Sequence, residues 1–271
     1  MLSITEKEFD KLASYIHQNY GIHLTEKKML LMTGRLSNLL ETKHIRNYSD
    51  YYDYVVSDHS GQAVTELIDK ITTNHTFFMR EAEHFKYFGD VVLPYLKKTI
   101  PDYDLRIWSA GCSYGQEPYT LSMIIQDYFE SSMHLWDTQL LATDISQKVL
   151  SKAIGGVYSA SEIAQLPLQW KINYFHQVGY DEYEVNEEIK RNIVFKKFNL
   201  MDTTFPFKRR FHVIFCRNVM IYFDNKTKEE LINKFYQMTE PGGYLFIGHS
   251  ESLNRETTDY KYVMPAVYRK E

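Results

Sequence analysis

LRIWSAGCSYGQEPY, residues 105–119, decides the fold of this 271-residue chain. Its first four residues form a short apolar run typical of a β-strand, and the small residues that follow, among them Gly111 and Gly115, break that run. From Gln116 the apolar residues recur at helical spacing, with Pro118 in the first turn, where proline is tolerated. A strand, a glycine loop and a helix N-terminus in this order form a typical nucleotide site. An ordinary strand-to-helix turn fits as well, because the full three-glycine dinucleotide fingerprint is missing.

The acids near this loop indicate which nucleotide it takes. A second buried run, residues 140–144, ends in Asp144, and an acid at the tip of the neighbouring strand is the usual acceptor for a ribose diol. Glu117 adds a second acid at the start of the helix, and two acids repel a phosphate. A ribose attached to a cation fits better, which favours S-adenosylmethionine, whose sulfonium is positive. The same observation disfavours an NAD-dependent enzyme.

Composition narrows the class of protein. The chain carries 22 Tyr and 16 Phe and a net charge of −4, which disfavours binding to nucleic acid or anionic membranes by bulk attraction. No apolar run approaches the length of a membrane span and the N-terminus has no signal-peptide layout, so we expect a cytoplasmic protein. Cys112 and Cys216 fit a reducing compartment, and we expect both to be buried apolar fillers. Nothing in the sequence demands more than a monomer.

The periodicity predicts three regions. Residues 1–72 are expected to form an all-helical domain that begins at a capping box on Thr5 and whose second helix is capped by Thr25. Residues 73–104 are expected to form a junction and a linking helix. Over residues 105–271 strands and helices alternate, which is typical of a parallel sheet with crossover helices. The alternation lapses over about 156–192, where aromatic-rich sequence predicts an inserted subdomain. The expected fold class is α/β, a Rossmann-like sheet with an N-terminal all-helical domain and a small inserted antiparallel β-subdomain.

Individual elements of the sheet domain follow from the same pattern. We expect strands at 105–109, 139–143, 193–198, 211–216 and 244–248, with a C-terminal pair near 260–268. Helices are expected at 117–129, 147–154 and 226–238. Glu240–Gly243 (EPGG) is predicted to be a turn before the fifth strand.

Polar residues follow the predicted strands at the sheet edge where ligands bind in open α/β proteins. Asn199 comes after the third strand, and its amide suits an adenine edge. Arg217, Asn218 and Tyr222 come after the fourth strand. Arg80 lies in the junction (TTNHTFFMRE, from residue 72) and is expected to face the cleft between the two domains.

Three further patterns have less specific meaning. The ten histidines include no HExxH or HxH pair and neither cysteine has a partner at ligand spacing, so no metal site is expected. His249-Ser250-Glu251 suggests a catalytic triad, but no nucleophile elbow accompanies it, so a polar loop at the cleft rim is predicted. A basic group stands out in the acidic chain and is either a solvated helix face or a docking surface for an acidic partner. Its members are Lys27, Lys28, Arg35, Lys43 and Arg46.

Together these motifs resemble the CheR family of bacterial chemotaxis-receptor methyltransferases. The stretches that carry the resemblance are TTNHTFFMRE, IWSAGCSYGQEPY, ATDIS, FNLMD, IFCRNVMIYFD and GHSESL, in the family's order. The resemblance implies methylation of specific glutamate side chains on the cytoplasmic helices of chemoreceptors. The reaction uses S-adenosyl-L-methionine and gives glutamate methyl esters and S-adenosyl-L-homocysteine in chemotactic adaptation.

The resemblance also implies the roles of single residues. Arg80 and Tyr222 are implied to lie nearest the transferred methyl group and to be catalytic. With Gly111 of the glycine loop, the cofactor-binding set is Asn74, Thr76, Arg80, Gly111, Glu117, Asp144, Asn199, Leu200, Arg217 and Asn218.

The chain departs from the family pattern at two places. Gln116 stands where the family often has Glu, which is tolerated if Glu117 makes the contact. Residues 179–185 lack the glycine-flanked, arginine-bearing segment of members that tether to a receptor's C-terminal pentapeptide, so such tethering is not expected. Two other functions stay open: a methyltransferase with a different acceptor, for which the acidic charge argues against RNA, and a cofactor-binding signalling protein without turnover.

Overall fold

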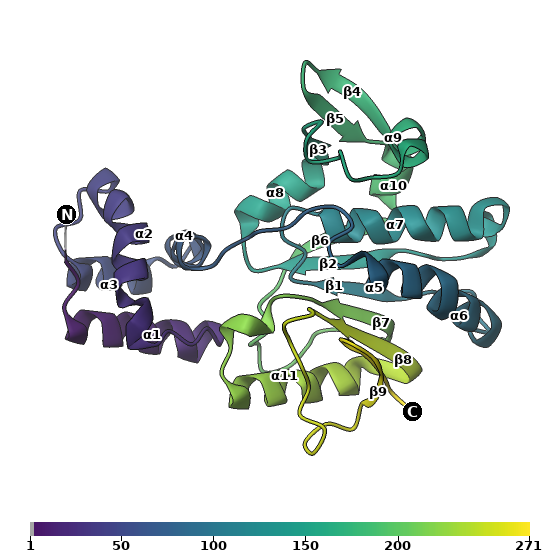
Figure 1. The fold of residues 1–271 in the computed structure, drawn as a ribbon. Helices are drawn as coiled ribbons and strands as arrows, with labels where there is room; N and C mark the ends of the chain where they lie inside the picture. The colour runs from purple at the N-terminus through teal and green to yellow at the C-terminus, as the bar shows by residue number, and fades with distance from the viewer. Residues whose placement is uncertain (1–2) are drawn as a thin grey trace.

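Short helices form the N-terminal part of the structure, a computed structural model that describes residues 3–271 (Figure 1). Apolar residues at helical spacing, among them Leu12, Leu36 and Leu67, are completely buried between these helices. The first helix begins at the predicted capping box on Thr5 and ends at Gly21, whose φ is 71°. The elements are α1 (Glu6–Tyr20), the 3-10 turn η1 (Glu26–Lys28), α2 (Met29–Thr42), α3 (Tyr48–Ser57) and α4 (Gln62–Ile71).

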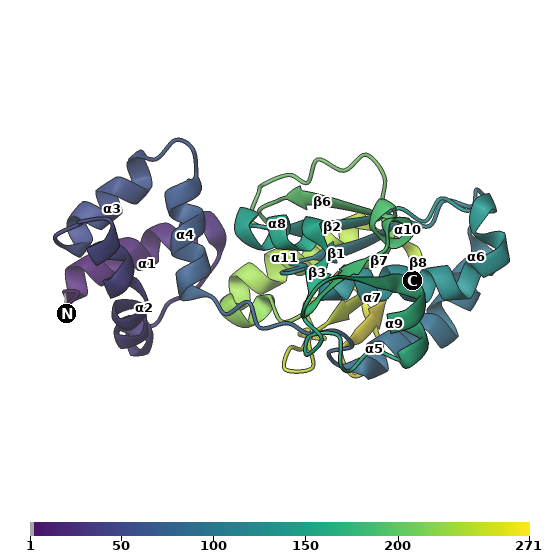
Figure 2. The same ribbon diagram turned by 90° about the horizontal axis from the view of Figure 1, so that it is seen from above.

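An extended segment leads from this bundle into a helix that is continuous but irregular. It consists of α5 (Ala82–Tyr87), the π-helical turn η2 (Phe88–Val92) and α6 (Leu93–Thr99). In Figure 2 the bundle lies beside the rest of the molecule, and the segment after α4 runs between the two parts. None of the helices within residues 3–271 is long and apolar enough to cross a membrane.

A seven-stranded sheet forms the centre of the remaining chain. Its strands are β1 (Ile107–Ala110), β2 (Leu140–Asp144), β6 (Ile193–Lys197), β7 (Phe211–Cys216), β8 (Thr239–Ile247), β9 (Lys261–Met264) and β10 (Val267–Arg269). They lie in the order β6-β2-β1-β7-β8-β10-β9, and β10 runs antiparallel to the other six strands. Because the strand order reverses at β1, the loops after β1 and β7 diverge and leave a crevice at the carboxyl edge.

Helices cover both faces of this sheet (Figure 1). One face packs against α7 (Gln116–Phe129), α8 (Gln147–Gly155) and the helix from α5 to α6, and the other against α11 (Asn225–Met238). Strand β7 is buried on both sides, so its residues alternate between two cores: Val213 and Phe215 join one, Ile214 and Cys216 the other. The second core continues into the N-terminal helices.

The predicted inserted hairpin is present and belongs to a small antiparallel sheet. It consists of β3 (Val157–Tyr158), β4 (Phe175–Gly179) and β5 (Glu182–Val185) in the order β3-β5-β4, with α9 (Leu168–Tyr174) and α10 (Glu187–Arg191) beside it. Trp170 donates a hydrogen bond to Asp127 of α7 (2.6 Å), and the Tyr174 hydroxyl donates to the same carboxylate. The aromatic residues thus anchor the insert to the main domain. The predicted fold class is confirmed.

Two local predictions are wrong. Glu240–Gly243 does not form a turn before the fifth strand but lies inside β8, where the register with β7 shifts between Phe211 and Val213. Gly242 adopts a φ of 80° there, so the glycines make an irregular strand instead of ending it. Thr25, predicted to cap the second helix, makes no side-chain cap, because η1 intervenes before α2.

The end of α1 and the segment after it attach the bundle to the sheet. Ile22 forms an antiparallel bridge with Phe223, just beyond β7. His17 Nε2 lies 2.7 Å from Asp224 Oδ2, and the other oxygen of Asp224 caps α11. The hydrogen bond from the Thr227 N–H, followed by the contact with His17, lowers the pKa of Asp224 to about 2, although burial acts to raise it. The helical part therefore reaches the same sheet edge as the crevice.

Arg35 joins α2 to the extended segment after α4. Its guanidinium donates to the carbonyls of Ile71 (3.1 Å) and Thr72 (3.0 Å) and to Thr73 Oγ1 (3.2 Å). These carbonyls lie at the C-terminus of α4, where a cation is favourable. Arg35 is therefore a structural residue of the junction and not a free member of a docking surface.

Candidate functional site

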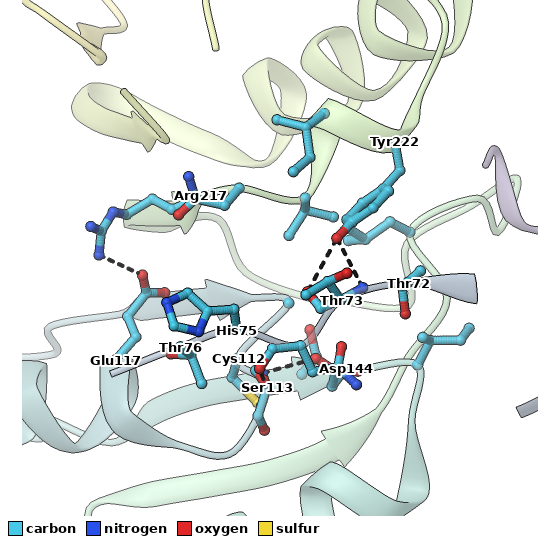
Figure 3. A pocket seen from close by; sticks show the side chains of 18 of the residues that line it. Thr72, Thr73, His75, Thr76, Cys112, Ser113, Glu117, Asp144, Arg217 and Tyr222 are labelled. Carbon is cyan, nitrogen blue, oxygen red and sulfur yellow. Dashed lines mark hydrogen bonds and ion pairs between the residues drawn. The ribbon is translucent and has the colours of Figure 1, made fainter. Parts of the chain in front are cut away.

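A pocket of about 280 Å³ opens at the carboxyl edge of the sheet, between the strand ends and the segment from Thr72 to Arg80 (Figure 3). All the residues proposed from sequence to bind a cofactor or to be catalytic line it. They are Asn74, Thr76, Arg80, Gly111, Glu117, Asp144, Asn199, Leu200, Arg217, Asn218 and Tyr222. Tyr20 and Ile22 from the N-terminal helices line it as well, which no sequence pattern indicated.

Asp144, the last residue of β2, is held with its carboxylate at the pocket. Its Oδ2 accepts a hydrogen bond from the Ser113 N–H (2.9 Å) and its Oδ1 from the Ser146 N–H (2.9 Å). Burial raises the pKa of Asp144 to about 6 and outweighs these two hydrogen bonds. Two backbone N–H groups thus fix the carboxylate of Asp144 at the pocket.

The two glycines of the loop after β1 serve packing inside the protein. Gly111 has a φ of 86°, and a Cβ there would lie 2.4 Å from Val219 in the turn after β7. Gly115 has a φ of 93°, and a Cβ would lie 2.9 Å from Ala153. The Gly111 N–H donates to the Thr143 carbonyl (2.8 Å). These glycines bring the loop against its neighbouring segments, and Gly111 also lines the pocket.

Arg217 lies between two carboxylates beneath the pocket. Its Nη1 is 2.9 Å from Glu117 Oε2 and its Nη2 is 3.1 Å from Glu81 Oε2, while only 3% of the side chain is exposed. The guanidinium also donates to the Arg80 carbonyl, and it stacks over Phe85 with its Cζ 5.0 Å from the ring centre. Bidentate use of a planar guanidinium fixes both acids in place.

Glu117 is therefore not the free negative charge that the sequence argument assumed. Besides Arg217, Ser109 donates its hydroxyl to Glu117 Oε1 (2.7 Å). Glu81 was missed by sequence reasoning, although it directly follows Arg80. Burial by itself would raise the pKa of Glu81, but Arg217 and Asn218 hold it below the usual value. Three segments distant in sequence thus meet in one ion-paired cluster.

Tyr222 and Arg80 both hold the extended segment over the pocket (Figure 3 shows Tyr222). The Tyr222 hydroxyl accepts from the Thr73 N–H (3.0 Å) and donates to the Thr73 carbonyl (3.1 Å). Arg80 Nη1 donates to the His75 carbonyl (2.5 Å). The His23 N–H donates to the Tyr222 carbonyl (2.8 Å), so the N-terminal part also fixes this tyrosine.

Asn199 is already engaged at the pocket rim. Its Nδ2 donates to the Asn19 carbonyl at the end of α1 (2.8 Å), and its Oδ1 accepts from the Met201 N–H (3.0 Å). Leu200 next to it is buried and apolar. This part of the pocket offers an apolar surface beside polar backbone. Cys112 and Cys216 are both buried, and burial raises the pKa of each thiol, in keeping with the filler role expected for them.

The basic group from the sequence is divided in the structure. Lys27 and Lys28 lie in η1, and Lys28 Nζ is 6.0 Å from the ring centre of Tyr222, at the pocket side. Lys43 pairs with Glu66 (2.9 Å) and Arg46 follows it, both beyond the opposite end of α2. Fourteen residues of helix separate the two ends by roughly 20 Å. Lys28 thus lies beside a residue of the pocket, whereas Lys43 and Arg46 lie beyond the far end of α2.

Two groups of possible metal ligands come together within residues 3–271, in arrangements that no sequence spacing indicates. One consists of His17, His23 and Asp224, and the other of Glu81, His84 and His249. Burial, followed by the nearby charge of Arg217, lowers the pKa of His84 to about 4, so this ring is neutral at physiological pH.

Comparison with known proteins gives a consistent result over the whole chain. Residues 7–72 match the family model described as the CheR methyltransferase all-alpha domain, and residues 74–268 match the CheR methyltransferase SAM binding domain. The chain is 44% identical to a chemotaxis protein methyltransferase of Borreliella burgdorferi, over 99% of this chain and 96% of that protein. It is 33% identical to one of Escherichia coli, over 93% of this chain and 87% of that protein.

Among solved structures, a glycopeptide N-methyltransferase in complex with S-adenosyl-L-methionine is 14% identical to this chain. The match covers 59% of this chain and 53% of that protein, with a TM-score of 0.32.

Titration of Asp144 predicts how cofactor affinity depends on pH. The ionised carboxylate accepts hydrogen bonds from a diol, and protonation removes an acceptor, so affinity for S-adenosyl-L-homocysteine should fall as the pH drops through about 6. Below that value the loss should approach about tenfold per pH unit. Calorimetric titration at several pH values between about 5 and 8 measures it. Asp144→Asn should bind weakly and without this pH dependence; the same dependence in that variant would contradict the assignment.

The same pKa shift acts on stability with the opposite sign. The folded protein keeps a proton on Asp144 up to about pH 6, whereas in the unfolded chain the carboxyl ionises near its ordinary value of about 4. Between these values the folded state binds more protons, so without cofactor this residue contributes stability below about pH 4 that is lost as the pH rises through about 6.

Proposed function

The chain belongs to the CheR methyltransferase family, and from this we propose that it methylates glutamate side chains on the cytoplasmic helices of chemoreceptors. It is an S-adenosyl-L-methionine-dependent methyltransferase of chemotaxis. The glutamate acceptor, the receptor as partner and the roles of single residues are the proposal. The net charge of the chain is negative, and tethering to a receptor pentapeptide is not expected. The proposed mode of recognition is therefore direct docking of receptor helices.

The residues present fit the cofactor. Asp144 would accept the ribose hydroxyls, Leu200 with Asn199 would face the adenine, and Glu117 with Arg217 would face the charged amino-acid end. Support comes from their common position around one pocket and from the ion pairs that fix Glu117 and Arg217 there. Bound S-adenosyl-L-methionine supplies an electrophilic methyl group on a positive sulfur.

A carboxylate acceptor suits this pocket because the acids that line it are engaged. Glu117 is paired with Arg217 and Ser109, and Asp144 accepts two backbone N–H groups, so neither is placed to remove a proton. A glutamate needs no such step, since its pKa of about 4.3 leaves it ionised near pH 7. The bound cofactor would supply its methyl group to one oxygen of the acceptor, with neutral S-adenosyl-L-homocysteine as the leaving group, so that the two opposite charges would be neutralised.

The protein then has to orient the acceptor and exclude water. Among residues 3–271 the Arg80 side chain donates only to the His75 carbonyl, which leaves further N–H groups of its guanidinium to hold a carboxylate. We assign Arg80 to this task and Tyr222 to lining the position of the sulfonium, where the face of an aromatic ring favours a cation. The proposal rests on this arginine at the pocket and on the hydrogen bonds that already engage the pocket acids Glu117 and Asp144.

Transfer of labelled methyl groups to a purified receptor cytoplasmic fragment tests the function. We expect label in the fragment that alkali releases as methanol, because esters hydrolyse there whereas methylated amines and amides do not. Asp144→Asn is the matched inactive control. Base-stable label, or binding of S-adenosyl-L-homocysteine without any labelling of receptor fragments, would reject the glutamate acceptor.

His75 also lines the pocket, and a histidine there could act as a base for an alcohol or amine acceptor. The proposal predicts otherwise: with saturating cofactor, the single-turnover rate should be flat between about pH 6.5 and 8. His75→Gln should retain at least about half of that rate. A rate that rises with one ionisation near pH 6.5, and that this substitution abolishes, would establish the alternative.

The two lysines of η1 provide a separable test of docking. Lys27→Glu with Lys28→Glu should reduce kcat/KM for the receptor fragment about tenfold at low salt, because attraction to an acidic partner mainly accelerates association. Affinity for S-adenosyl-L-homocysteine, measured by calorimetry, should stay within about twofold. Arg46→Glu, at the far end of α2, is the matched control and should change neither. Equal losses in the Arg46 variant would mean that net charge alone matters.

A further inference from the structure

Glu251, in the loop after β8, directs its carboxylate to backbone N–H groups and not to the neighbouring His249. Oε2 accepts from Gly248 (2.6 Å) and Asn218 (3.0 Å), and Oε1 accepts from Ile221 (3.1 Å). Burial raises the pKa of Glu251 in spite of these bonds. The two oxygens therefore tie the turn after β7 to the loop after β8.

The turn that Glu251 holds has a strained conformation. Asn218 adopts a φ of 60°, which is uncommon for any residue other than glycine and persists only where its surroundings fix it. Its side-chain Nδ2 donates to Glu81 Oε1 (3.2 Å), while its backbone N–H donates to Glu251. At Gly248 a Cβ would lie 2.4 Å from Asn218 Nδ2, so the approach of the two segments requires a glycine there.

The same turn is a wall between two cavities. Asn218, Val219 and Ile221 line the cofactor pocket, and Ile221 with Glu251 also lines a second, polar cavity of about 490 Å³ on the other side. Met220 is buried in the core, whereas Ile221 is 45% exposed, so side-chain packing holds the turn from one side only. Hydrogen bonds to its backbone fix the turn where packing is absent.

Tyr222 directly follows Ile221, whose N–H donates a hydrogen bond to Glu251. It ends η4 (Met220–Tyr222), and its hydroxyl makes both hydrogen bonds to Thr73. We propose that Glu251 is a positioning residue, whose carboxylate holds residues 218–221 so that Asn218 and Tyr222 face the cofactor. For Tyr222 this inference rests on the proposed function, whereas for Asn218 it needs only cofactor binding.

Glu251→Gln tests the inference with little change of shape. The amide places an N–H donor where an oxygen now accepts, so at least one backbone N–H loses its partner. Affinity for S-adenosyl-L-homocysteine, measured by calorimetry, should fall about tenfold. Glu256→Gln, an exposed acid farther along the same loop, is the matched control and should bind like the parent. Affinity of the Glu251 variant within about twofold of the parent would overturn the proposal.

A measurement on the parent protein needs no variant to fold. The amides of Asn218 and Ile221 should be protected from hydrogen exchange, although they lie in a turn beside open pockets. Exchange at the rate of a free loop would overturn the proposal.

Methyl transfer separates positioning from general stability. In a Tyr222→Phe background, Glu251→Gln should slow turnover much less than in the parent, because both changes disturb one unit. Additive losses would show that Glu251 does not act through Tyr222. If the parent methylates no receptor fragment, the proposed function fails, while the binding and exchange results still decide the role of Glu251.

Discussion

The position of one buried guanidinium determines how this site is built. Arg217 stands at the end of β7 and pairs with Glu117 at the start of α7 and with Glu81 before α5. Removing one member of a buried ionic group leaves the others uncompensated, at a cost of roughly 3–5 kcal/mol. The strand end, the glycine-loop helix and the junction therefore cannot shift independently.

The pocket consequently belongs to neither half of the chain alone. Thr73 is held from the helical side by Arg35 and from the sheet side by Tyr222, while Arg80 holds the His75 carbonyl. Asn199 from the sheet reaches the end of α1. A junction fastened from both sides can cover the cofactor and, at its outer face, meet a second macromolecule. This arrangement suits a transfer between a small molecule and a protein.

The residues predicted from the sequence line one pocket because strand ends in a parallel sheet meet at one edge. Asp144, Asn199 and Arg217 were found in this way, and the glycine loop was recognised by its place between a strand and a helix. Each of these predictions uses only the position of a residue relative to the strand or helix that directly precedes or follows it in the chain. The capping box at Thr5 succeeded for the same reason.

The predictions that failed concern partners distant in sequence. The sequence argument treated Glu117 as a free acid, because its partner Arg217 lies a hundred residues later in the chain. Arg35 donates to carbonyls at the C-terminus of a helix that begins 27 residues after it, so its role has no local signal. Glu240–Gly243 combines turn residues, but pairing with β7 keeps this segment in the sheet.

The account depends most directly on Arg217 bridging its two acids. Calorimetric titration of Arg217→Lys with S-adenosyl-L-homocysteine tests it, because lysine keeps the charge but lacks the planar fork that reaches both carboxylates. Arg269→Lys, on a strand remote from the pocket, is the control. The account predicts at least about tenfold weaker binding for the first variant and parental binding for the second. Parental affinity in Arg217→Lys would contradict it.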